Sequence, residues 1–200
     1  MKTNNQGNDT LNKKIKRIGV LTGGGDCPGL NAVIRAIVKT AHHEYDIEII
    51  GFEDGYEGLI EGRYRKIDLR DASGILAQGG TILGTSNRAD PFRFPVLQND
   101  GYVYLDRSSQ GVLNYEKLGL DALIAIGGDG TMGASAGMIE KGLPIIGVPK
   151  TIDNDLVGTD VTFGFDSAVI TATDAVDKIH TTAQSHHRVM FVEVMGRYAG

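Results

Sequence analysis

Short apolar runs alternate with glycine-rich turns and amphipathic stretches along most of the chain. Residues 17–21 form a run typical of a buried strand, and the glycine turn 22–29 follows it directly. From Leu30 to Ala41, apolar residues recur at a spacing of three and four, which predicts a helix with one buried face. A second apolar run, 47–52, closes a first strand–helix–strand unit.

The same pattern returns further along the chain. Residues 122–126 predict a strand, and a glycine loop, a helix that reaches Ile139 and a strand at 145–148 follow it. Strands that alternate with helices indicate a parallel sheet covered on both faces. We therefore predict an α/β fold with a Rossmann-like parallel sheet flanked by helices. Residues 85–114 have weak periodicity, and their elements stay unassigned.

The pattern changes after Asp160. Apolar residues between Phe165 and Ile179 follow one face of a long helix, and residues 189–194 predict a strand. One helix and one strand do not make a domain, so we interpret residues 164–200 as the incomplete start of a second α/β lobe. The predicted division of the chain is a flexible tail at 1–14, one domain at 15–163 and this partial lobe.

Composition narrows the classes of function. A formal net charge of -5 over 200 residues argues against a general nucleic-acid binder, because nucleic-acid backbones are held by an excess of Lys and Arg. A small anionic substrate stays possible, since local cations can outweigh the global sign. The single cysteine, Cys27, excludes an internal disulfide and a cysteine-rich metal site. Without an apolar signal core or a membrane-length apolar run, we expect a soluble cytoplasmic protein.

Two glycine loops follow predicted strands. The turn at 22–29 offers backbone N–H groups and a helix N-terminus to an anion, or serves only as a tight turn. In Gly127-Gly-Asp-Gly-Thr131, the glycines allow a nucleotide's phosphates to approach the backbone. Asp129 can hold Mg²⁺ directly or through water. The alternative is a turn with a solvated aspartate.

The acidic loop Thr151-Ile-Asp-Asn-Asp155 follows the strand at 145–148. Asp153 can accept a proton from an attacking hydroxyl, while Thr151 and Asp155 can bind substrate or position metal and base. The alternative is an Asx-rich turn that caps the next element. Adjacent parallel strands bring their C-terminal loops together, where open α/β sheets bind ligands. The combination of Asp129 and Asp153 indicates phosphoryl transfer.

Cations must balance the phosphates, although each of them alone can be a solvated surface residue. Arg197 lies at the end of the predicted strand 189–194, where its guanidinium can bind phosphate as a fork. The spacing of His186 and His187 gives no zinc pattern, and we expect no metal other than Mg²⁺. The other candidate cations are Arg88, Arg93, Lys150 and Arg188.

These residues resemble the 6-phosphofructokinase family, from about Lys16 to Gly200. Kinases of NAD or diacylglycerol share Gly-Gly-Asp-Gly-Thr but lack the acidic loop, so they match less well. Four motifs carry the resemblance: Gly24-Gly-Asp-Cys-Pro-Gly-Leu-Asn31, Gly127-Gly-Asp-Gly130, Pro149-Lys-Thr-Ile-Asp-Asn-Asp155 and Met195-Gly-Arg-Tyr198.

The resemblance implies that residues 15–163 bind ATP and that Asp129 is the Mg²⁺ ligand. Asp153 matches the general base that acts on the 1-hydroxyl of fructose 6-phosphate, and Arg197 joins it in catalysis. Arg188 matches an arginine that reaches the sugar phosphate of a neighbouring subunit, which implies an oligomer, typically an allosteric homotetramer. The implied ATP contacts are Gly24, Arg88, Ala89, Arg93, Gly128, Gly130 and Thr131. The implied sugar contacts are Thr151, Ile152, Met195, Gly196 and Arg197.

The phosphoryl donor is where the pattern is mixed. In this family, the pattern of pyrophosphate-dependent members is Gly-Gly-Asp-Asp in the second glycine loop and Pro-Lys-Thr at the start of the acidic loop. The pattern of many bacterial ATP-dependent members is Gly-Gly-Asp-Gly and Pro-Gly-Thr. This chain combines Gly130 with Lys150. Gly130 leaves room for the α-phosphate of a nucleotide, so we favour ATP.

A pyrophosphate-dependent enzyme and a non-catalytic nucleotide-binding chain remain the alternatives. The family's sugar site also uses residues beyond position 200. We therefore expect a polypeptide that ends at Gly200 to be poorly soluble or inactive.

Overall fold

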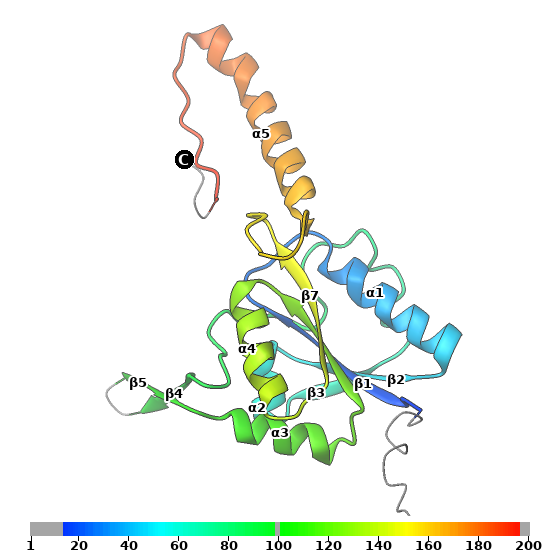
Figure 1. Ribbon diagram of the computed structural model, residues 1–200. Helices are drawn as coiled ribbons and strands as arrows, with labels where there is room; N and C mark the ends of the chain where they lie inside the picture. Colours follow the sequence, from blue (N-terminus) through cyan, green and yellow to red (C-terminus); the bar gives the residue numbers. More distant parts are fainter. Residues whose placement is uncertain (1–13, 99–100, 197–200) are drawn as a thin grey trace, which may run out of the picture.

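A computed structural model describes residues 14–98 and 101–196 of the chain. Nearly all of the predicted N-terminal tail therefore lies outside the described residues. The core is a six-stranded sheet with helices on both faces (Figure 1), which confirms the predicted α/β class. The strand order is β3-β2-β1-β6-β7-β8. These strands are β1 (Arg17–Gly23), β2 (Glu48–Phe52), β3 (Tyr64–Ile67), β6 (Ala122–Gly127), β7 (Ile145–Thr151) and β8 (Phe163–Gly164).

The sheet is mixed rather than wholly parallel. Strands β1, β2, β6, β7 and β8 run parallel to one another, whereas β3 pairs antiparallel with β2. Only the short helix α2 (Tyr56–Glu61) lies between β2 and β3. A parallel crossover needs a connection of a dozen or more residues, so this shorter one returns the chain antiparallel. The predicted parallel sheet is confirmed for the other five strands, and the antiparallel edge strand β3 was not predicted.

Alternate residues of the central strands supply two separate cores. Ile18 and Val20 of β1 pack on one face, in the same cluster as residues of α1 (Leu30–Thr40). Leu21 points to the other face, in the cluster formed with α2, α3 (Ser108–Lys117) and α4 (Asp129–Glu140). Because side chains of a strand alternate between faces, one apolar run supplies both cores. This is the two-sided burial that the continuous apolar runs predicted.

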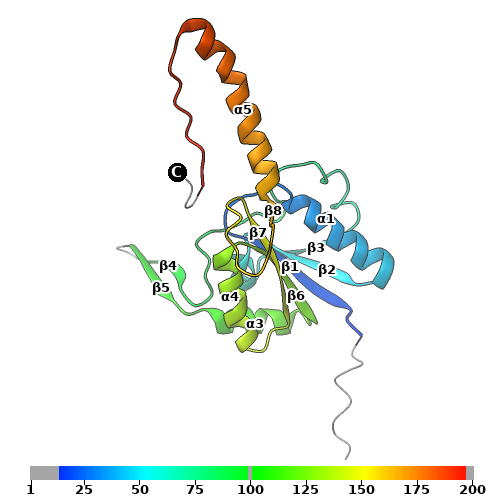
Figure 2. The ribbon, with the colours of Figure 1, turned by 45° about the horizontal axis from the view of Figure 1, so that its top comes forward.

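Residues 85–114, which the sequence left unassigned, contain a hairpin and a helix. Strands β4 (Phe94–Gln98) and β5 (Gly101–Leu105) pair antiparallel, and the hairpin projects from the body of the protein (Figures 1 and 2). All of β5 is exposed. A strand with no buried face has no apolar alternation, so the periodicity of this region was weak.

The C-terminal region leads away from the sheet. Helix α5 (Phe165–His186) extends away from the sheet (Figure 2) and confirms the predicted long helix, although none of its residues is buried. The predicted strand at 189–194 was wrong, since these residues form no strand. A strand requires a neighbour for its hydrogen bonds, and the described chain offers none to this segment. Among the described helices, none combines the length and the hydropathy that a bilayer crossing requires.

Helix α2 packs closely against the backbone of the residues that flank it, and we expect a substitution at Gly58 to lower the free energy of unfolding. A Cβ at Gly58 would overlap the Glu53 carbonyl oxygen and lie 2.7 Å from the Arg63 carbonyl oxygen. Both are backbone atoms, so no side-chain rotation relieves the overlap. We expect Gly58→Ala to lower the free energy of unfolding of the full-length protein by about 1–3 kcal/mol, measured by denaturant titration.

Gly133→Ala is the matched control in helix α4. Gly133 is exposed, and a Cβ there meets no atom within 4 Å. Alanine is favoured over glycine inside a helix by about 1 kcal/mol, so this variant is expected to be as stable as the parent or more stable. An equal loss in both variants would contradict the packing argument at Gly58.

Candidate active site

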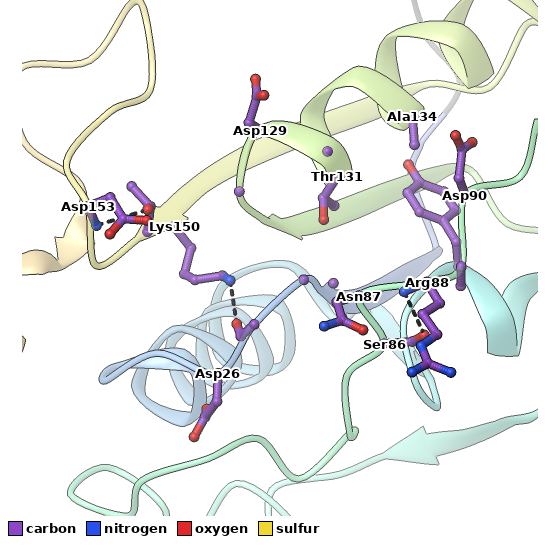
Figure 3. A pocket seen from close by; sticks show the side chains of 18 of the residues that line it. Asp26, Ser86, Asn87, Arg88, Asp90, Asp129, Thr131, Ala134, Lys150 and Asp153 are labelled. Carbon is purple, nitrogen blue, oxygen red and sulfur yellow. Dashed lines mark hydrogen bonds between the residues drawn. The ribbon is translucent and has the colours of Figure 1, made fainter. Parts of the chain in front are cut away.

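Three loops meet at the carboxyl edge of the sheet, after β1, β6 and β7. The chain leaves β1 toward β2 and leaves β6 toward β7, on the opposite side, so the strand order reverses between β1 and β6. Open α/β sheets bind ligands at such a switch point. A cavity of about 610 Å³ lies here, and Asp129 and Asp153 both line it (Figure 3). The expectation that the two aspartates share one cleft is confirmed.

The first glycine turn forms one wall of this cavity. Gly24 has a φ of 81°, in the left-handed region that favours glycine, and its N–H donates to the Ser86 carbonyl oxygen at 3.0 Å. A Cβ at Gly23 would lie 2.6 Å from Thr131 Oγ1, and a Cβ at Gly127 would lie 2.6 Å from Thr131 Cγ2. The absence of side chains at these glycines therefore lets the first turn of α4 pack against β1 and β6.

Helix α4 points its N-terminus into the cavity. Gly128 is the N-cap residue, and Asp129 is the first residue of the helix. A helix N-terminus carries unpaired N–H groups and a partial positive charge, both of which favour an anion. Gly128, Asp129, Gly130 and Thr131 all line the cavity. The glycine loop predicted at 127–130 is thus shorter than expected, because helix α4 already begins at Asp129.

The acidic loop after β7 forms the opposite wall. Thr151 Oγ1 accepts a hydrogen bond from the Asp153 N–H at 3.1 Å and donates one to Asp155 Oδ1 at 3.3 Å. Thr151, Ile152, Asp153 and Asp155 all line the cavity. The hydroxyl of Thr151 therefore fixes the backbone of one acid and the carboxylate of the other, which places both beside the space that α4 faces.

Lys150 brings a buried cation to the same space. Its side chain is 4% exposed, and Nζ donates to the Gly25 carbonyl oxygen at 2.5 Å (Figure 3). Burial lowers the pKa of the Lys150 ammonium, and the neighbouring Cys27 and Asp26 partly offset that effect. Burial likewise raises the pKa of the Cys27 thiol. A cation that is already stripped of most of its water is well placed to interact with phosphate.

The remaining predicted ATP and sugar contacts lie partly in this cavity and partly in an adjoining one. Arg88, Ala89 and Met195 line the cavity with the residues above. Gly196 lines an adjoining cavity of about 550 Å³, which Asp153 and Met195 share. Arg197 lies outside the described residues.

Two predicted arginines are placed away from the cavity. The guanidinium of Arg93 lies 5.5 Å from the centre of the Tyr104 ring, over the hairpin, and Arg93 does not line the cavity. Arg188 is exposed just beyond the end of α5. The predicted roles of these two residues remain predictions.

Sequence reasoning missed several residues of the cavity wall. Tyr56 is 3% exposed, and its hydroxyl shares a 2.7 Å hydrogen bond with Ser135 Oγ. Burial raises the pKa of Tyr56 to about 12, although the bond to Ser135 opposes the shift. The local signal for Tyr56 was Gly55, just before it in the turn that follows β2, because the other loops at this edge also carry glycines. The missed lining residues are Asp26, Tyr56, Ser86, Asn87, Asp90 and Ala134.

Comparison with known proteins agrees with this geometry. The sequence profile described as "Phosphofructokinase" matches residues 17–200. The chain belongs to the phosphofructokinase family. It is 56% identical over 187 residues to an ATP-dependent 6-phosphofructokinase 2 of Clostridium perfringens. This match covers 93% of this chain and 51% of that protein. The fold also resembles a phosphofructokinase structure from Saccharomyces cerevisiae, with a TM-score of 0.75 and a sequence identity of 35%. The match covers 92% of this chain and 26% of that chain.

Relatives named for both phosphoryl donors occur within this phosphofructokinase family. In Streptomyces coelicolor, an ATP-dependent 6-phosphofructokinase 2 is 56% identical to this chain, over 92% of it and 51% of the relative. A pyrophosphate–fructose 6-phosphate 1-phosphotransferase of the same organism is 51% identical, with the same shares covered. The chain spans about half the length of the curated relatives it matches.

Proposed function

We propose that the phosphofructokinase containing this chain transfers the terminal phosphoryl group of ATP to the 1-hydroxyl of fructose 6-phosphate. The products are fructose 1,6-bisphosphate and ADP, as in glycolysis. The observation that carries the proposal is the shared cavity, in which Asp153 stands across from the N-terminus of α4 and Asp129. The names of its 56% identical relatives support the choice of substrates.

The nucleotide's phosphates are proposed to bind between the first glycine turn and α4. Backbone N–H groups at the start of α4 favour anions there, and Arg88 and Lys150 add positive charge to the same cavity. Phosphoryl transfer depends mainly on in-line positioning and on neutralising charge. In this arrangement, residues 15–163 bind the nucleotide and residues 164–200 begin the sugar-phosphate site.

Asp153 is proposed to take the proton of the attacking hydroxyl. Its backbone is tied to Thr151, and its carboxyl-bearing loop lines both the nucleotide cavity and the adjoining cavity that contains Met195 and Gly196. A hydroxyl held where these two cavities meet is proposed to lie between the base and a phosphate bound at α4. Ile152, Met195, Gly196 and Arg197 complete the proposed sugar contacts.

The residues of the cavity fit a bound Mg²⁺. In the part of the chain that the structure describes, no group of three or more His, Cys, Asp or Glu side chains could hold a metal ion without help. Mg²⁺ commonly binds through one or two carboxylates together with substrate phosphates, so Asp129, which lines the cavity, is proposed as the protein ligand. When bound, the ion would neutralise charge on the transferring phosphoryl group.

Donor choice rests on Gly130, and a substitution tests it. A Cβ at Gly130 meets no atom within 4 Å, so aspartate fits there without disturbing the free protein. A carboxylate at this place repels the nucleotide's phosphates, and like charges in contact cost several kcal/mol. We expect Gly130→Asp to lower kcat/KM for ATP by about 100-fold or more, measured by coupled release of ADP.

Gly133→Asp is the matched control for this experiment. It adds the same side chain to the same helix, one turn further on, at an exposed position outside the cavity. Its kcat/KM for ATP is expected to stay within about twofold of the parent, since a solvated charge is largely screened. Unchanged use of ATP by Gly130→Asp contradicts the proposed phosphate position.

The second candidate is transfer from pyrophosphate. The 51% identical Streptomyces coelicolor relative is named for that donor, and Lys150 belongs to the Pro-Lys-Thr pattern that resembles pyrophosphate-dependent members. Turnover of the full-length protein with fructose 6-phosphate is measured with ATP and with pyrophosphate in parallel. Faster turnover with ATP supports the first proposal, and faster turnover with pyrophosphate replaces it by the second. Absence of transfer from either donor rejects both.

Assembly and location are further parts of the proposal. Arg188, exposed just beyond the end of α5, is proposed to reach the sugar phosphate of a neighbouring subunit, which requires a homo-oligomer, for which we propose a tetramer. Arg93 is proposed to approach the nucleotide beside Ala89. We further propose a cytoplasmic enzyme under allosteric control, with ATP and fructose 6-phosphate as its partners and without nucleic acid or membrane binding.

A further inference from the structure

Asn154, between the two acids of the loop, has an uncommon backbone conformation. Its φ is 50°, and among the described residues only three other non-glycine positions have a positive φ. The left-handed conformation costs an ordinary L-residue about 1–2 kcal/mol, and asparagine tolerates it better than most. Asp153 and Asp155 line the cavity, whereas Asn154 does not. The turn at Asn154 therefore shapes the loop without occupying the site.

The side chain of Asn154 is held from outside the loop. Asn154 Oδ1 accepts a hydrogen bond from the Thr162 N–H at 3.1 Å. Thr162 is 2% exposed, and its hydroxyl donates to the Thr151 carbonyl oxygen, also at 3.1 Å. Thr162 comes directly before β8, which pairs with the end of β7. One buried residue is thus bonded to both ends of the segment that carries Asp153.

We infer that Asn154 and Thr162 are positioning residues for the base. Together with the Thr151 hydroxyl, which fixes the Asp153 N–H, they hold the Asp153 carboxylate at one place in the cavity. Neither residue contacts substrate in this role. The inference rests on the proposed function, because it assigns a task to residues that act only through Asp153.

Asn154→Ala in the full-length protein tests this role. Alanine lacks the oxygen that Thr162 contacts and disfavours the left-handed conformation. We expect kcat to fall about 10- to 100-fold, since a displacement of about 1 Å in a catalytic group can cost about 100-fold, while KM for ATP stays within about twofold. Normal kcat in this variant overturns the inference.

A double-mutant cycle separates positioning from a general structural effect. In the Asp153→Asn background the base is already absent, so adding Asn154→Ala is expected to lower the residual kcat by less than about twofold. A further loss of the same size as in the single variant overturns the inference. If Asp153→Asn alone leaves turnover intact, the proposed function fails; if Asp153→Asn is slow but Asn154→Ala is normal, only the positioning role fails.

Three more variants define the contribution of each contact. Asn154→Gly regains part of the turnover lost in the alanine variant, because glycine adopts a positive φ freely; a glycine variant no faster than alanine contradicts the backbone role. Thr162→Val lowers kcat in the same direction but less. Asn114→Ala is the matched control: its amide binds the Leu59 and Ile60 carbonyl oxygens, away from the cavity. It is expected to lower the thermal midpoint with kcat unchanged within about twofold.

Discussion

Asp153→Asn is expected to lower the turnover of the full-length protein about 10²- to 10⁴-fold, the usual cost of losing a general base. Asparagine has nearly the shape of aspartate, and residue 153 contributes only its backbone N–H to the hydrogen bond with Thr151 Oγ1, so the loop is retained. The amide cannot accept the proton of the sugar hydroxyl. Steady-state kinetics with ATP and fructose 6-phosphate measure the loss, and KM for fructose 6-phosphate is expected to change much less than kcat.

Asp160→Asn serves as the control for the loss of a carboxylate in this region. Asp160 is exposed and does not line the cavity, although it lies only seven positions from Asp153 in the chain. Its turnover is expected to remain within about twofold of the parent. Near-normal turnover of Asp153→Asn, or an equal loss in both variants, rules out the assignment of Asp153 as base.

Asp129→Ala is expected to lower kcat/KM for ATP by about 100-fold or more and also to change the Mg²⁺ requirement. Stabilisation of phosphoryl charge by a metal ion accounts for several kcal/mol, and each 1.36 kcal/mol corresponds to about tenfold in rate. The variant is also expected to need a higher Mg²⁺ concentration for half-maximal turnover. Titration of turnover against Mg²⁺ at saturating fructose 6-phosphate measures both quantities.

Asp129 lies at a helix N-terminus, where a carboxylate also stabilises the helix. The control variant must therefore separate a loss of helix stability from a loss of metal binding. Asp106 is a comparable residue outside the cavity: its carboxylate accepts a hydrogen bond from the Ser108 N–H at 2.8 Å at the start of α3. Asp106→Ala is expected to reduce thermal stability without changing the Mg²⁺ requirement. An unchanged Mg²⁺ requirement in Asp129→Ala contradicts the proposed metal ligand.

Local periodicity predicted most of the elements that carry the site. The apolar runs at 122–126 and 145–148 became β6 and β7, the helical spacing after the first glycine turn became α1, and the helix expected after the second glycine loop became α4. These elements are buried on one or both faces, so their apolar residues repeat regularly. The hairpin β4–β5 and the unpaired segment 189–194 were not predicted correctly, because exposure and strand pairing depend on which other segments lie beside them.

Motif chemistry predicted which aspartates would share a cavity, but it did not predict how they are held. The rule that loops at the carboxyl edge converge placed Asp129 and Asp153 together. The roles of Thr162 and Tyr56 have no counterpart in local spacing, since each depends on a hydrogen bond to a residue on another element.

The amino-acid order by itself determined the α/β alternation, the glycine turns after the strands and the chemical character of each loop. These features follow from backbone preferences and from apolar patterns a few residues long. Only the tertiary structure decided that β3 runs antiparallel, that Thr131 packs against the glycines of two strands, and that Thr162 bonds to both ends of the loop around Asp153. Those outcomes depend on contacts between residues far apart in the chain, which local sequence patterns do not specify.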